Sequence, residues 1–405
     1  MINGLRLSSL IVICALMTAC TDSQIAHFEQ DETLPVQGKL ISVSKVGSYS
    51  HLTLRFLFWM QGMAKALPTE HGIELYRVVY GTQAPDGRLV RASGLLALPK
   101  TPPPYRGVVS WQHGTASLRN AAPSSLDHFN GLLPAAVFAG HGYVLLAPDY
   151  IGYGVSEEPH SYYHTKSMAH AVTDFIAANI ALFQQQDVAW PGDLYLAGFS
   201  QGAHASLASQ RLIESAGTYD FGLRGVASVA GAVDLANVGI ASALEGKSKF
   251  GSLYIAWIAV SYARDYGLAL DSVLKEPWVT IAPDLFDGEH SGDVIVSALP
   301  AVPTDMLTDE FITAVKGGYE HPFLSLMRKN ELLNWSPVAP VCAYYGDHDV
   351  DVTPPQAVLL GKLASTRSKI KIQSVGPLDH ESSMIAAAPL LRNWFDGGAV
   401  ANCGG

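Results

Sequence analysis

The segment DLYLAGFSQGAHASLAS, residues 193–209, decides the fold. An apolar run typical of a buried strand ends in Gly-Phe-Ser-Gln-Gly, and a helix pattern rich in small residues follows. This spacing is typical of a nucleophile elbow, a tight strand-to-helix turn that holds Ser200 in a strained backbone conformation above the sheet. Gly198 and Gly202 would remove the Cβ atoms that collide in such a turn. The flanking strand and helix patterns therefore favour a nucleophilic serine over a chance match.

The helix that follows the serine supplies a second element of the predicted chemistry. Its N-terminus lies near Gln201, where the helix dipole and a free backbone N–H favour negative charge. We expect the N–H of Gln201 to be one donor of an oxyanion hole.

Buried-strand patterns alternate with helix-length segments along most of the chain. Continuous apolar strands separated by helices predict an α/β fold with a mostly parallel sheet covered on both faces. Two β-rich runs at 73–82 and 88–99, joined by a Pro-Asp-Gly turn, predict an antiparallel hairpin at the N-terminal edge. The parallel strands are expected at 107–114, 142–150, 193–199, 225–233, 341–346 and 369–375.

Residues 236–335 interrupt this alternation and divide the predicted core into residues 41–235 and 336–405. An insertion that follows a strand lies above the sheet edge where ligands bind, so we expect a helical cap or lid. A helical subdomain packed on itself fits the same placement. The aromatic residues Tyr254, Trp257 and Tyr262 are typical of a core, with an acyl-binding slot as the alternative.

The N-terminus has the pattern of an export signal. A positive charge precedes a short apolar run at residues 10–20, too short to span a bilayer. The sequence MTAC at 17–20 resembles the bacterial lipoprotein processing box, which implies a lipidated Cys20 and an outer-membrane lipoprotein. Plain secretion with cleavage near Ala19, giving a periplasmic or extracellular protein, is the alternative. Residues 21–40 are polar and aperiodic, as expected for a tether.

Composition excludes some functions. The 405-residue chain carries a formal net charge of -10 and lacks a cluster of basic residues, which argues against a nucleic-acid partner. No Cys/His spacing typical of a metal site occurs. Once the signal is removed, Cys342 and Cys403 remain in a compartment that permits disulfides, so these two cysteines can pair.

From about residue 73 to residue 395 the chain resembles the α/β-hydrolase superfamily. Three stretches, SWQHGTAS at 110–117, APDYIGYGVSEEPHSYYHTKS at 147–167 and AGFSQGAHAS at 197–206, resemble its secretory lipase branch. Members of that branch carry a large lid between the sixth and seventh core strands. The resemblance implies a serine hydrolase whose triad follows the order Ser, acid, His.

That order assigns the remaining triad positions. The stretch YYGDHDVDVTP at 344–354 offers Asp347, Asp349 and Asp351, and the superfamily's Gly-x-x-Asp-x-x-Val-Pro run places Asp349 as the acid. Thr353 departs from the usual proline of that run. His380 is the only histidine that follows both Ser200 and these acids, which makes it the expected general base.

The family also implies a second oxyanion donor on the loop after the first parallel strand. His113, Gly114 and Thr115 match the family's His-Gly-x segment, whose third residue offers its backbone N–H. Thr115 is therefore the predicted partner of the Gln201 N–H. His113 is expected to support this loop and not to carry protons.

These observations predict a secreted or lipid-anchored serine esterase or lipase that needs neither metal nor organic cofactor. Its expected substrate is a small-molecule or lipid ester, and its expected membrane contact is the lipid on Cys20. Two alternatives stay open: a serine peptidase or aminopeptidase on the same fold, and a non-catalytic binding protein that keeps the fold.

Overall fold

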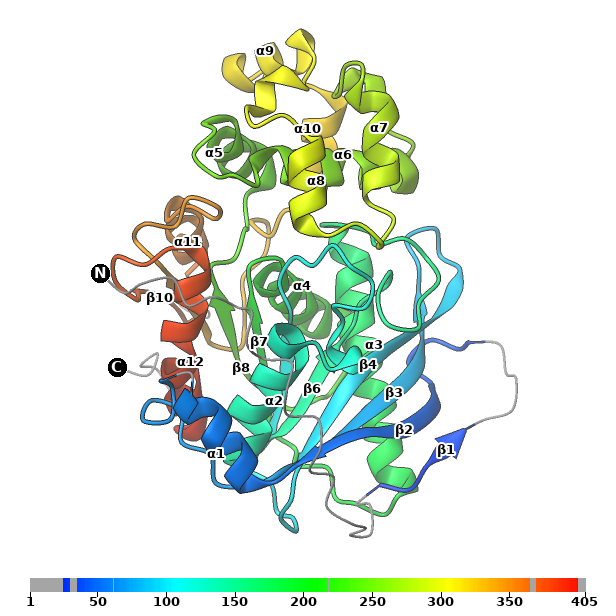
Figure 1. The fold of residues 1–405 in the computed structure, drawn as a ribbon, viewed down its shortest axis with the longest axis vertical. Coiled ribbons are helices and arrows are strands. Elements are labelled where there is room, and N and C mark those ends of the chain that lie inside the picture. The colour runs from blue at the N-terminus through cyan, green and yellow to red at the C-terminus, as the bar shows by residue number, and fades with distance from the viewer. Residues whose placement is uncertain (1–24, 30–34, 61, 218, 365–368, 400–405) are drawn as a thin grey trace.

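The computed structural model describes residues 25–29, 35–60, 62–217, 219–364 and 369–399. One sheet forms its centre, with strand order β1-β2-β3-β4-β6-β5-β7-β8-β9-β10 (Figure 1). Neighbouring strands pair antiparallel from β1 through β4 to β6 and parallel in the rest of the sheet. The strands are β1 (Phe28–Glu29), β2 (Leu40–Tyr49), β3 (Ile73–Gln83), β4 (Leu89–Pro99), β5 (Val108–Gln112), β6 (Val144–Pro148), β7 (Leu194–Phe199), β8 (Leu223–Val229), β9 (Val341–Tyr345) and β10 (Ile370–Ser374).

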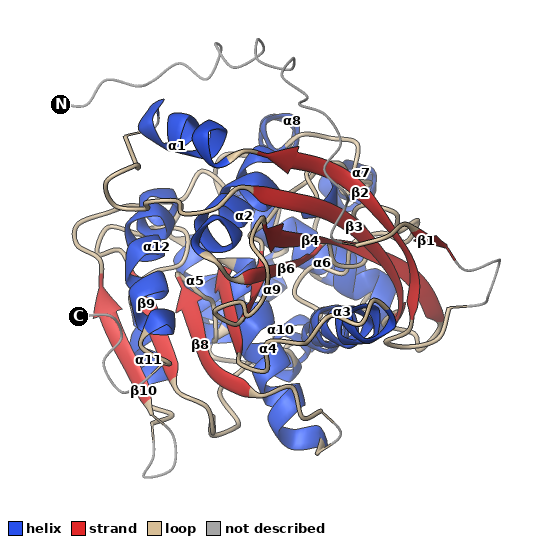
Figure 2. Cartoon of the chain, turned by 90° about the horizontal axis from the view of Figure 1, so that it is seen from below, coloured by secondary structure: helices blue, strands red, loops and turns tan. Residues whose placement is uncertain are grey.

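Helices cover both faces of the sheet (Figure 2). One face packs against α3, α4 and α11 in a single apolar cluster, and the other packs against α1, α2 and α12. The helices are α1 (His51–Met60), α2 (Leu133–Phe138), α3 (Thr165–Gln185), α4 (Gln201–Ala216), α5 (Ile240–Leu244), α6 (Gly251–Tyr266), α7 (Trp278–Leu285), α8 (Gly292–Ala298), α9 (Asp309–Gly317), α10 (Pro322–Lys329), α11 (Pro355–Gly361) and α12 (His380–Asp396).

The predicted α/β architecture is confirmed, and the burial of the central strands explains why the sequence could predict it. Every residue of β5, β6 and β7 is buried, because each of these strands has neighbours on both sides and helices on both faces. Such strands carry continuous apolar runs that stand out in a sequence. The antiparallel β3–β4 hairpin also forms as expected, although β2 and β1 extend the sheet beyond it.

The helices α5 to α10 lie together beyond one end of the parallel strands (Figure 1). They share their own apolar cluster, in which Trp257 and Tyr262 are buried. Helix α6 is buried around most of its circumference, which accounts for the uncharged run along its first three turns. The limits 236–335 given above for a cap remain a prediction.

Part of the segment predicted as a tether is instead ordered against the core. Within residues 21–40, Phe28 and Glu29 form β1 and pair with Val43 and Ser42 of β2. Ile25 is buried, and its N–H donates to the hydroxyl of Tyr76 at 3.3 Å. A two-residue strand is too short to give a periodic pattern, so polarity alone made this stretch resemble a linker.

The predicted processing site lies outside the described residues, and so do Cys20 and Cys403. Cys342 in β9 is disulfide-bonded, while its pairing with Cys403 stays a prediction. In the ranges that the structure describes, no helix combines the length and the apolar character needed to cross a bilayer.

Candidate active site

Ser200 occupies the junction between β7 and α4. Its backbone has φ 56° and ψ −120°, a combination that side-chain-bearing residues seldom adopt. A hydrogen bond of 2.9 Å from its N–H to the carbonyl of Val229 in β8 holds the turn in place. The strained conformation is therefore fixed by the neighbouring strand, as an elbow requires.

The two glycines that flank the turn are required by space. A Cβ built on Gly198 would lie 2.2 Å from the carbonyl oxygen of Gly202, and one on Gly202 would lie 2.0 Å from the carbonyl oxygen of Gln112. Contacts this short would force the backbone of the turn or of its neighbours to move. Helix α4 can thus approach β5 and β7 closely only when both positions lack side chains.

Asp349 and His380 form a buried pair at the ends of β9 and β10. The Nδ1–H of His380 donates to Oδ2 of Asp349 at 2.7 Å. The other carboxylate oxygen accepts the backbone N–H groups of Asp351 and Val352, each at 2.9 Å. The carboxylate is therefore fixed in orientation, and Nε2 of the imidazole is left for other chemistry.

Ser200 and His380 line one cavity of about 530 Å³. The ring of Phe199, next to the serine in sequence, lies 4.6 Å from the imidazole of His380, centroid to centroid. In the described part of the chain no hydrogen bond joins Oγ of Ser200 to this imidazole. Such bonds between nucleophile and base often tighten only when substrate is bound.

The predicted oxyanion donors both belong to residues around this cavity. Thr115 lines it, and Gln201 follows Ser200 directly. Within the described ranges, the backbone N–H of each residue makes no hydrogen bond. The hydroxyls of Thr115 and Tyr162 are hydrogen-bonded at 2.7 Å, which ties the loop after β5 to residues before α3.

A buried histidine fixes the side chain of Gln201. His160 Nδ1–H donates to the carbonyl of Ile151 at 2.8 Å, so its Nε2 accepts from the amide of Gln201 at 2.7 Å. Burial lowers the pKa of His160 to about 3, which keeps the ring neutral. No local sequence motif predicts His160 or Tyr162 as a site residue, because both act through tertiary contacts.

His113 is buried, one residue before Gly114 and Thr115, which line the cavity. Its two ring nitrogens face the carbonyls of Gly114 and Asp149, at 2.8 and 3.2 Å, and its ring stacks on Tyr150. Burial lowers the pKa of His113. The side chain is thus buried and packed between the loop after β5 and the residues after β6.

The two alternative acids lie in different surroundings. Asp347 is exposed and accepts the hydroxyl of Ser374 at 2.8 Å. Asp351 borders the cavity and accepts the hydroxyl of Ser248. Among the described residues, only Asp349 of these three contacts His380. In the same ranges no group of three or more His, Cys, Asp or Glu side chains is arranged to hold a metal ion.

The fold is that of the α/β hydrolases. A Legionella pneumophila protein proposed to be a hydrolase superposes with a TM-score of 0.82 at 25% identity, covering 89% of this chain and 98% of its own. The rice cell wall degrading esterase LipA of Xanthomonas oryzae gives 0.78 at 23%, covering 88% and 98%. Candida antarctica lipase A gives 0.67 at 17%, covering 91% and 85%.

No curated protein matches the sequence significantly. Residues 133–397 match the secretory lipase family, and this stretch extends from the start of α2 to the end of α12. It holds Ser200, Asp349 and His380 and makes up well over half of the chain. The chain belongs to the secretory lipase family.

Proposed function

We propose that this protein is a serine esterase or lipase that hydrolyses carboxylic esters through Ser200, Asp349 and His380. The hydrogen bond between His380 and Asp349, beside a cavity that Ser200 also lines, is the observation that carries the proposal. Family membership supports the same reaction class.

In the first half-reaction, Oγ of Ser200 attacks the ester carbonyl carbon while Nε2 of His380 takes its proton. The new oxyanion accepts hydrogen bonds from the N–H groups of Gln201 and Thr115. The carbon–oxygen bond to the alcohol then breaks, and the imidazolium gives its proton to the departing alkoxide oxygen. Asp349 stabilises the positive imidazolium throughout.

In the second half-reaction, water attacks the acyl-enzyme. His380 takes a proton from the water, and the oxyanion again rests on the same two N–H groups. When the bond to Oγ breaks, the proton returns to Ser200 and the carboxylic acid leaves. Since every group in this cycle belongs to the chain, no cofactor enters any step.

Export is part of the proposal. The family is one of secretory lipases, which supports delivery outside the cytoplasm. We assign residues 1–20 to a signal with a lipoprotein-type box, in which Cys20 becomes the lipidated N-terminus of the mature protein and reaches the membrane through that lipid. Replacing Cys20 with alanine should release the protein from the membrane fraction, whereas an unchanged distribution would contradict the anchor.

The deciding experiment compares p-nitrophenyl acyl esters with aminoacyl anilides. An esterase turns over the esters, and Ser200→Ala removes that activity. Anilide turnover without ester turnover would instead establish a peptidase. Absence of both activities, together with no reaction with a fluorophosphonate, would contradict the enzyme assignment and favour the binding-protein alternative.

A further inference from the structure

We propose that three buried tyrosines, Tyr150, Tyr153 and Tyr162, position the loop that carries the oxyanion donor Thr115. This inference rests on the proposed esterase function and adds three positioning residues to it. All three tyrosines lie in the stretch 147–167, for which the reaction itself assigns no role. We call residues 113–116 the oxyanion loop.

The oxyanion loop needs support because its backbone is irregular. Residues 113–117 follow β5 directly and lie in neither a helix nor a strand. Gln201, in contrast, is the first residue of α4, so the helix fixes the direction of its N–H. An oxyanion donor is effective when it is held in place before the charge develops. Contacts with other segments must therefore hold the N–H of Thr115.

Each tyrosine hydroxyl contacts a different residue of the oxyanion loop. These hydrogen bonds join Tyr150 to the carbonyl of His113 at 3.2 Å, Tyr153 to the carbonyl of Ala116, and Tyr162 to the hydroxyl of Thr115 at 2.7 Å. The loop is thus held at both of its ends and at the donor residue between them.

Burial keeps the three hydroxyls able to donate. Each tyrosine is 1% exposed, and burial raises the pKa of each hydroxyl above its ordinary value of 10. None of them therefore ionises at the pH where an ester hydrolase works. Loss of one hydroxyl would leave its buried partner in the loop without that hydrogen bond, so the loop would have to move to restore it.

The tyrosines belong to one packed unit, because the stretch after β6 folds back on itself. A Cβ built on Gly152 would lie 2.4 Å from the Cα of His160, so the backbone touches at these two residues. The ring of His160 lies 4.7 Å from that of Tyr153 and 6.0 Å from that of Tyr162, centroid to centroid. The hydrogen bonds to the loop therefore come from a single rigid support.

Helix α6 holds Tyr162 from the other side. The ring of Tyr162 stacks on Trp257, with centroids 4.5 Å apart and planes inclined by 12°. The N–H of Tyr162 donates to Oγ of Ser261 at 3.2 Å, one turn further along α6. The guanidinium of Arg264 donates to the carbonyl of His160 at 3.0 Å. Through Tyr162, a helix from beyond the sheet thus contributes to the oxyanion hole.

Tyr162→Phe tests the support, because it removes the hydroxyl and keeps the ring against Trp257. Acylation and deacylation both pass through the oxyanion, so both should slow. We expect kcat for p-nitrophenyl butyrate to fall about tenfold, with KM within about twofold of wild type. Tyr80→Phe is the matched control. Tyr80 is also buried, and its hydroxyl donates to the carbonyl of Ala171 at 2.7 Å, so its kcat should stay within about twofold.

A transition-state analogue separates positioning from a merely structural role. When an aliphatic trifluoromethyl ketone binds, Oγ of Ser200 adds to its carbonyl carbon, the proton passes to His380, and the ketone oxygen becomes an oxyanion. The inhibition constant of this ketone should rise in Tyr162→Phe by about the factor by which kcat falls. A tyrosine that only stabilised the fold would lower the free energy of unfolding and leave this constant unchanged.

Thr115→Val removes the same hydrogen bond from the side of the loop. It should reproduce the loss of kcat seen in Tyr162→Phe, and Thr115→Ser, which keeps a hydroxyl, should restore most of it. The double variant Thr115→Val with Tyr162→Phe should be no slower than either single variant, since both act through one bond.

The inference is overturned if Tyr162→Phe keeps the kcat and the inhibition constant of the wild type. A much larger loss in Thr115→Val than in Tyr162→Phe would also overturn it, because the hydroxyl of Thr115 would then act on the substrate directly. Failure of the esterase function itself is recognised separately, since the wild type would then neither cleave the ester nor react with a fluorophosphonate.

Discussion

Asp349 accepts a hydrogen bond from Nδ1 of His380 at 2.7 Å, and two backbone N–H groups hold its other oxygen. The pair is buried, with 2% of Asp349 and 8% of His380 exposed to solvent. The turn after β9 thus fixes the carboxylate, and its hydrogen bond to Nδ1 orients the imidazole with Nε2 on the far side of the ring. The loops after β9 and β10 thus hold the acid and the base that the proposed reaction of Ser200 requires.

Replacing Asp349 by asparagine should lower kcat for a soluble ester by about 10³- to 10⁴-fold, because the imidazolium loses its charge partner and its tautomer is no longer fixed. Steady-state kinetics checks this. Asp347→Asn is the matched control, since that carboxylate is exposed and contacts Ser374, and its kcat should stay within about threefold of wild type. Equal losses in both variants would refute the assignment of the acid.

Gly202→Ala should destabilise the fold by about 3 kcal/mol or more, since its Cβ would lie 2.0 Å from the carbonyl oxygen of Gln112. Gly397→Ala is the control. There the closest atom to a new Cβ is 3.5 Å away, an ordinary contact, so the change should stay below about 1 kcal/mol. Urea unfolding measures both. A stable Gly202→Ala variant would show that α4 does not need this close approach.

His160 should make stability depend on pH. Burial lowers its pKa from 6.5 to about 3, so the unfolded chain binds a proton that the folded chain does not. The stabilisation is therefore complete above pH 6.5 and is lost as the pH falls toward 3, by about 1.4 kcal/mol per pH unit.

The measurement of this pH dependence must remove the contributions of other titrating groups to the free energy of unfolding. Burial raises the pKa of Asp174 to about 7, so this carboxyl favours the folded state as the pH falls. The free energy of unfolding of wild type minus that of His160→Asn cancels such terms. This difference should decline as the pH falls from 6.5, whereas a flat difference would mean that the fold leaves the pKa of His160 unshifted.

The disulfide of Cys342 should contribute to stability. Cys342→Ser should lower the free energy of unfolding by about 2–4 kcal/mol, since the cross-link restricts the unfolded chain. If Cys403 is the partner, Cys403→Ser should have the same effect, and the double variant should be no less stable than either single one. A free thiol at Cys403 in the folded wild type would disprove the pairing.

The parts of the molecule that depend on local sequence patterns can be predicted from the sequence. The elbow at Ser200 and the buried strand before it are adjacent in sequence, and their environment forces glycine and apolar residues there. The acid and base positions came from the family's order of residues, and the contact between Asp349 and His380 accords with that choice.

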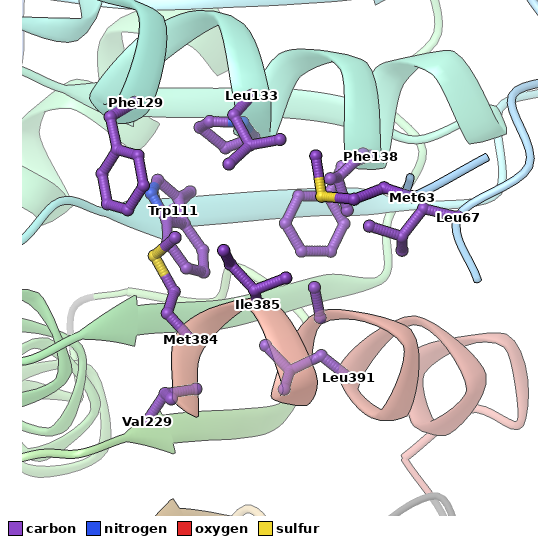
Figure 3. A pocket seen from close by; sticks show the side chains of 13 residues that line it. Met63, Leu67, Trp111, Phe129, Leu133, Phe138, Val229, Met384, Ile385 and Leu391 are labelled. Atoms are coloured by element: carbon purple, nitrogen blue, oxygen red, sulfur yellow. The ribbon is translucent and has the colours of Figure 1, made fainter. Parts of the chain in front are cut away.

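Other features depend on contacts between distant segments, which leave no local pattern. The polar stretch containing Phe28 resembled a linker, yet its backbone pairs with β2. The hydrogen bonds of His160 to Gln201 and of Tyr162 to Thr115 join loops far apart in the chain. The apolar pocket between α2 and α12 is likewise lined by segments that meet only in the fold, among them those of Met63 and Met384 (Figure 3).

The identity of the nucleophile is tested most directly by fluorophosphonate labelling of the full chain, followed by mass spectrometry of its peptides. The account predicts one adduct, on Ser200, that parallels loss of ester hydrolysis. Ser200→Ala should form no adduct, and its kcat should fall by at least about 10⁴-fold. Undiminished ester hydrolysis by Ser200→Ala, or an adduct on a different serine, would contradict it.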